Sequence, residues 1–82
     1  MMVRDGMEPY KERLLDERDE LLERMVKLNA ILADESNGVL GFELNCPVEL
    51  LWEQYAAMDE YLAALNDRVE IECGMGPLYP KM

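Results

Sequence analysis

The side chains that could do chemistry in this sequence are mainly cations and tyrosines, because the chain contains no histidine. Histidine is the commonest general base and the commonest metal ligand in proteins. Tyr10 follows Pro9 at the start of a helical pattern, and Lys11 and Arg13 come directly after it. An aromatic ring at a helix N-terminus can stack on a nucleobase while the helix end and nearby cations meet phosphate. The simpler interpretation is that Tyr10 packs against a neighbouring helix.

A second polar set follows one line of the sequence at a spacing of seven residues. It consists of Gln54, Tyr61 and Arg68. Between positions 47 and 73 there are seven acidic residues and a single basic one, Arg68. An isolated arginine in an acidic helix is a natural contact for an anion, since its planar fork can donate two parallel hydrogen bonds. The alternative is a solvated helix edge.

Nothing in the residue types favours catalysis. A nucleophile needs an adjacent base, and none is suggested without histidine. Cys46 and Cys73 form no CxxC pair, so a structural zinc site within one chain is excluded. The charged run ERLLDERDELLERM is also typical of helical chorismate-mutase-like enzymes, but that chemistry needs cations from several helices. We therefore predict no enzyme, no cofactor, no catalytic residue and no metal site.

The first element that must position these residues is a helix over about residues 9–35. Proline is tolerated at the first helical position, where its missing N–H has no partner anyway. Leucines recur every seven residues, beside a second apolar seam, so the stripe is wide enough for more than one neighbour. The two seams consist of Leu14, Leu21, Leu28 and of Leu15, Leu22, Val26. The same helix holds the cations Lys11, Arg13, Arg18, Arg24 and Lys27.

A second helix is predicted over about residues 47–72, where one heptad seam is sustained. Gly74, Gly76, Pro77 and Pro80 follow it and end the pattern. The connector 37–45 is too apolar for a free loop, which predicts a flap over the end of the helix pair; a short strand or a 3₁₀ turn is the alternative. The seam consists of Val48, Leu51, Tyr55, Met58, Leu62, Leu65 and Val69.

Two long helices with a short connector predict an all-α, antiparallel two-helix hairpin. The domain spans residues 1–73, and residues 74–82 form a flexible tail unless Leu78 and Tyr79 anchor it on a neighbour. The cysteines lie at opposite ends of the second helix, roughly 40 Å apart at 1.5 Å per residue, so they cannot pair within a chain. Reduced thiols indicate a cytoplasmic protein.

The size and the apolar surface of the chain favour self-association. With 82 residues it hides only a modest share of its surface when folded alone, and its seams exceed what one hairpin can cover. We therefore expect the hairpin to assemble into a homo-oligomeric helical bundle.

The overall charge restricts the partners. The formal net charge is -10, which disfavours duplex nucleic acid because phosphate contacts drive that binding. An acidic interaction protein, either a DNA mimic or a direct inhibitor of a host defence protein, fits this charge. No apolar run is long enough to cross a bilayer, and the start of the chain lacks the apolar core of a secretory signal. We expect no membrane partner.

Residues 9–32 and 50–69 carry a recognisable pattern, PYKxR…KLNAIL followed by LLWEQ…AM…Y…L…R. This pattern resembles a family of small phage proteins related to one from crAss-like phages. Some members are anti-CBASS sponges, which sequester the cyclic oligonucleotide signals of bacterial immunity. The resemblance implies a non-catalytic sponge in the cytoplasm of an infected bacterium. It also implies a homo-oligomer, with a hexamer favoured, and cyclic dinucleotides or trinucleotides as partners.

The resemblance also implies site residues. Cyclic dinucleotides bind between protomers of the family, with an aromatic side chain on the base and a cation on the phosphate. Tyr10 matches the aromatic residue, and either Arg24 or Lys27 matches the cation. A cyclic trinucleotide site uses an arginine late in the second helix, which matches Arg68. The sequence departs from the family pattern in a longer, more apolar connector and an additional C-terminal tail.

Overall fold

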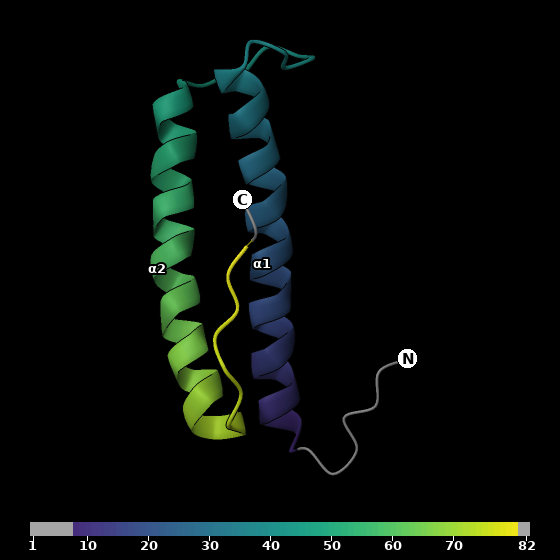
Figure 1. Cartoon of the computed structure of the whole chain (residues 1–82), viewed down its shortest axis with the longest axis vertical. Coiled ribbons are helices and arrows are strands. Elements are labelled where there is room, and N and C mark those ends of the chain that lie inside the picture. Colours follow the sequence, from purple (N-terminus) through teal and green to yellow (C-terminus); the bar gives the residue numbers. More distant parts are fainter. Residues whose placement is uncertain (1–7, 81–82) are drawn as a thin grey trace.

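The computed structural model describes residues 8–80 and shows a two-helix hairpin (Figure 1). Helix α1 spans Pro9–Ser36 and helix α2 spans Val48–Cys73. The start of the chain, where no secretory signal is expected, and residues 81–82 lie outside the described part. The all-α hairpin predicted from the heptads is confirmed, since the two helices pack against each other along their length.

Both helices end where glycine permits the chain to turn. Gly38 follows α1 with φ 71°, and Gly74 follows α2 with φ 68°, in the left-handed region that disfavours residues with a Cβ atom. The Gly74 N–H donates to the carbonyl oxygen of Glu70 at 3.0 Å, which closes the last turn of α2. The Asn37 N–H does the same for α1 by donating to Ala33 at 3.0 Å. These stops fix the length of the hairpin.

The core follows the predicted seams except in α1 at Val26, which is 49% exposed, and at Leu22, which is half-buried; it is also deeper in one half of the hairpin. In α2 the seam is buried at Leu62, Leu65 and Val69. The same seam is only half-buried in the first part of α2, from Val48 to Met58. The buried apolar residues of α1 are Leu14, Leu15, Leu21, Met25, Leu28 and Leu32.

The connector has no strand within the described residues and consists of turns and bends. It folds over the end of the hairpin, where Leu40, Phe42 and Leu44 line a hollow of about 330 Å³ with residues of both helix ends. The alternative of a strand is therefore wrong for this segment, whereas the flap stays a prediction, since Val39 and Phe42 are exposed.

The C-terminal segment 74–80 lies back along the hairpin rather than extending from it (Figure 1). The side-chain amide of Asn66 donates to the carbonyl oxygen of Leu78 at 2.9 Å, and the Leu78 N–H donates to Asn66 Oδ1 at 3.1 Å. The Asn66 side chain thus satisfies both the N–H and the carbonyl group of Leu78, as the backbone of a paired β-strand would. Of the two arrangements that the sequence allows, a free arm and a docked one, the structure has the docked one.

Candidate functional site

Tyr10 lies at the open end of the hairpin, where α1 begins and α2 ends. Its hydroxyl donates to Glu72 Oε2 at 2.8 Å, and this hydrogen bond raises the pKa of Tyr10 to about 12. The side chain is nevertheless 43% exposed. Lys11 Nζ lies 5.9 Å from the ring centroid, within reach of a cation–π contact. The hydroxyl is therefore fixed to the neighbouring helix while much of the side chain remains open to solvent.

The Tyr10–Glu72 contact sets the register of the hairpin and shows which predicted residues are neighbours. Arg68 lies four residues before Glu72, so it is only about 6 Å along the axis from the level of Tyr10. Lys11 and Arg13 follow Tyr10 in the first turn of α1. The structure thus brings Tyr10, Lys11, Arg13 and Arg68 to one end of the molecule, with Arg13 and Arg68 exposed.

Arg24 and Lys27 lie elsewhere. They follow Tyr10 by 14 and 17 residues of one continuous helix, which places them about 21 and 26 Å further along α1. Lys27 Nζ also forms an exposed ion pair with Glu23 at 3.2 Å. One small ligand cannot contact Tyr10 and either of these cations on the same copy of the chain. A site that combines them must take them from different copies.

The polar line on α2 is an exposed edge. Gln54, Tyr61 and Arg68 are all exposed, and they are spaced about 10 Å apart along the helix. Within residues 8–80 no ion pair holds the Arg68 guanidinium. The geometry of a single chain is that of a solvated edge, and a junction would again need further copies.

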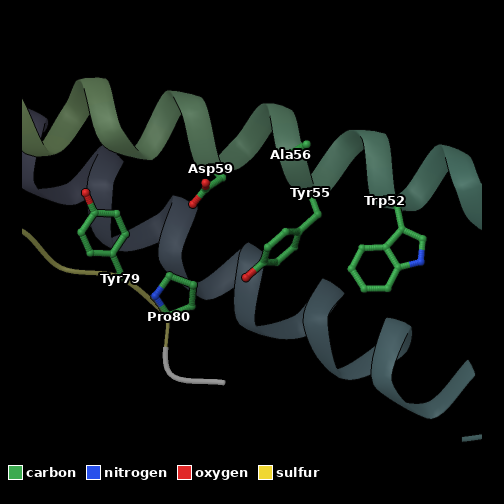
Figure 2. Close-up of a pocket in the computed structure, with 6 residues that line it drawn as sticks. All are labelled: Trp52, Tyr55, Ala56, Asp59, Tyr79 and Pro80. Carbon is green, nitrogen blue, oxygen red and sulfur yellow. The ribbon is translucent and has the colours of Figure 1, made fainter. Parts of the chain in front are cut away.

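The structure also contains a groove that the sequence analysis did not identify. It has a volume of about 350 Å³ and is lined by α2 and by the C-terminal segment (Figure 2). Figure 2 shows Trp52, Tyr55 and Asp59 pointing to the same side of α2, with Tyr79 and Pro80 beside them. The helical spacing of Trp52, Tyr55 and Asp59 was a visible signal, but the part played by Tyr79 depends on how residues 74–80 dock.

The chemistry of this groove suits a flat, uncharged ring. Aromatic side chains offer π-faces on which any nucleobase can stack. Asp59 adds a carboxylate that can accept a hydrogen bond from an amino group and repels phosphate. We define this set of residues, Trp52, Tyr55, Ala56, Asp59, Tyr79 and Pro80, as the aromatic groove.

These features define a small helical protein that presents rings and cations on its surface. The chain belongs to the Sequestin family, whose model matches residues 8–71. This match confirms the family that the sequence pattern resembles, and it extends over the connector. It ends before residues 74–80, so the docked C-terminal segment lies beyond the matched part. No curated protein and no solved structure matches the chain.

The family name denotes sequestration, which is the work of a binding protein rather than a catalyst. In the part of the chain that the structure describes, neither helix is both long and apolar enough to cross a membrane.

Proposed function

We propose that this protein sequesters cyclic oligonucleotide second messengers and thereby blocks CBASS-type immunity in the cytoplasm of an infected bacterium. The observation that carries the proposal is membership of the Sequestin family over residues 8–71. Each copy lowers the concentration of free signal by occupancy alone, so no bond is broken. This mode of action requires tight binding and abundant protein.

The geometry of the predicted residues supports a site between copies. Tyr10 presents an exposed ring beside Lys11, and this end of the hairpin also carries Arg13 and Arg68. Arg24 and Lys27 are too distant to act with Tyr10 of the same copy. In a homo-oligomer, with a hexamer favoured, Tyr10 of one copy stacks on a base while Arg24 or Lys27 of another meets the phosphate.

Arg68 is proposed as the contact for a cyclic trinucleotide. In a symmetric oligomer several copies of this exposed arginine meet at a junction. Without an anion the guanidinium groups repel each other, whereas each can fork onto one phosphate of a cyclic trinucleotide. This site and the Tyr10 site draw on different helices.

Recovery of intact ligand tests the proposal. The protein is incubated with a panel of cyclic dinucleotides and trinucleotides, separated from free ligand, and denatured; the released material is then identified by mass spectrometry. We expect at least one member of the panel to be retained and released unchanged. Release of hydrolysed ligand would contradict a sponge, and retention of no member would contradict nucleotide binding.

A second candidate is an acidic protein that inhibits a host defence protein directly, or that mimics DNA. The observation that favours it is the formal net charge of -10, with seven acidic residues and one basic residue between positions 47 and 73. Such a protein would block the purified defence effector without lowering the concentration of free cyclic nucleotide. Measuring both quantities in one assay distinguishes the two functions.

A further inference from the structure

Arg18 is buried in the hairpin although it carries a charge. Only 5% of the residue is exposed, and its Nε and Nη1 atoms have no hydrogen-bond partner. Arg18 forms an ion pair with the half-exposed Asp19, but Asp19 Oδ1 lies 3.7 Å from Nε, which is too long for a hydrogen bond. Buried guanidinium donors without hydrogen bonds are costly, so Arg18 has two donors to offer to an acceptor.

Arg18 of α1 lies at the same level of the hairpin as Asn66 of α2. In the register set by Tyr10 and Glu72, Arg18 is about 12 Å from Tyr10 and Asn66 is about 9 Å from Glu72, so the two lie at nearly one level. Arg18 lies between Leu14 and Leu15 on the helical wheel of α1, and both leucines are buried as well. One partner helix covers a single seam, so a stripe this wide needs a further cover. Asn66 holds Leu78, so the C-terminal segment reaches the level of Arg18 and can supply this cover.

The same segment leads to the aromatic groove. Trp52, Asp59 and Asn66 are spaced seven residues apart, so they follow one side of α2. The C-terminal segment occupies this track from Asn66 to Asp59, and the groove is the part that it leaves open. Tyr79 and Pro80 form the boundary between the two parts (Figure 2).

We propose that residues 77–80 are a displaceable cover, and that Arg18 and Asn66 beneath it form a binding site for a phosphate group. When the cover leaves, Arg18 Nε and Nη1 and the Asn66 amide become available together. These are donors of the kind that bind a phosphate oxygen, with the guanidinium supplying a charge-assisted fork. This inference rests on the proposed function for its ligand, because a nucleotide whose base stacks on the α2 wall of the groove, at Trp52 and Tyr55, would place a phosphate toward Arg18 once residues 77–80 have left.

The first test measures how accessible Arg18 is. Leu78→Pro removes the N–H that donates to Asn66, whereas Leu78→Ala keeps both backbone groups and serves as the matched control. Both proteins are treated with phenylglyoxal, and modification is followed by peptide mass spectrometry. Arg18 should react about two- to tenfold faster in Leu78→Pro than in the control, the change expected for one lost hydrogen bond. Exposed Arg13 and Arg24 should react equally in both.

A second variant releases the C-terminal segment by a substitution in α2. Asn66→Leu deletes both hydrogen bonds to Leu78 and places an apolar side chain of similar size at this buried position. It should accelerate modification of Arg18 at least as much as Leu78→Pro does, with helical content checked by circular dichroism. Unchanged reactivity of Arg18 in both folded variants would overturn the proposal that residues 77–80 cover Arg18.

The third test addresses the ligand with inorganic phosphate and with cyclic di-adenosine monophosphate, against chloride at equal ionic strength. In Leu78→Pro, saturating phosphate should protect Arg18 from phenylglyoxal roughly ten- to a hundredfold, as expected for one charge-assisted contact. Protection by neither probe would overturn the anion site. Protection by phosphate in a protein that retains no cyclic oligonucleotide would leave this site standing and contradict the proposed function instead. Tight binding of cyclic nucleotides without protection of Arg18 would contradict this inference alone.

Discussion

The two halves of α2 carry one uninterrupted apolar seam, yet they differ in how well that seam is buried. Leu62, Leu65 and Val69 in the second half are at most 1% exposed. Leu51 and Tyr55 in the first half are only half-buried. The second half lies beside the docked C-terminal segment as well as α1, whereas the first half borders the open groove. The comparison teaches that one seam is buried to different depths along α2, and that the deeply buried half is the one on which the C-terminal segment docks.

We call the first half of α2, from Val48 to Met58, the open half, and the second half, from Leu62 to Val69, the covered half. The open half retains surface that another copy can cover. Trp52 and Leu50 are about half exposed, and the neighbouring connector adds exposed Val39 and Phe42. These exposed apolar side chains are available for contact with a second copy. We expect the homo-oligomer predicted from the sequence to use this half as a contact between copies.

The largest expected effect concerns Arg68, on the outer edge of the covered half. Arg68→Ala should abolish binding of a cyclic trinucleotide, because each guanidinium–phosphate contact is worth about 1.5–3 kcal/mol and one substitution removes it from every copy. Calorimetric titration measures the loss. Any dinucleotide binding that depends on Tyr10 should persist, and equal loss at both sites would show instead that Arg68 holds the assembly together.

The next effect compares the two halves directly. Leu65→Ala leaves a cavity in the covered half and should lower the free energy of unfolding by about 2–5 kcal/mol. Leu51→Ala in the open half should cost clearly less under conditions where the protein is dissociated. Denaturation with urea, followed by circular dichroism, gives both values. An equal loss would mean that the seam is buried equally in both halves and would break the comparison.

Tyr10 gives a smaller effect at the open end of the hairpin. Tyr10→Ala should weaken binding of a cyclic dinucleotide by roughly ten- to a hundredfold, since stacking of a base on an aromatic ring contributes about 1–3 kcal/mol. Tyr10→Phe is the matched control, because it keeps the ring and loses only the hydrogen bond to Glu72. If the alanine variant binds as well as the unmodified protein, Tyr10 only packs against α2.

The smallest effect is a pH dependence of that same contact. The hydrogen bond to Glu72 raises the pKa of Tyr10 in the folded protein to about 12, above the usual value of about 10. The contribution of this contact to stability is complete below pH 10 and is lost as the pH rises toward 12. Ultraviolet absorbance of tyrosinate follows the titration. In Glu72→Gln, Tyr10 should titrate at a lower pH, and an unchanged titration would show that Glu72 is not the cause.

Much of the fold could be predicted from local pattern. Two helices were predicted from the seven-residue spacing of Leu14, Leu21 and Leu28 and from the seam between Val48 and Val69. This was possible because the period of a helix and the side that it buries follow from the local order of residues. Gly74 signalled the end of α2 for the same reason. These features need no knowledge of which distant residues meet.

The parts that could not be predicted depend on tertiary register. Asn66 holds Leu78 through backbone atoms, and any residue except proline carries those atoms, so the pairing leaves no signal in the sequence. Arg18 resembled one more surface cation of α1, because charged residues flank it in the sequence and its burial arises only from tertiary packing. The aromatic groove needs Tyr79 beside Trp52 and Asp59, which only the docked segment provides.

The mass of the protein in solution tests most directly the claim that the open half is covered by further copies. Light scattering at micromolar concentration, combined with size-exclusion chromatography, should give a particle larger than a dimer, with about six times the 9.5 kDa mass of one chain favoured. Trp52→Glu, which places a charge in the exposed half, should shift that mass downward while preserving helical content. A monodisperse 9.5 kDa monomer would contradict the shared sites and, with them, the account of the protein as a sponge.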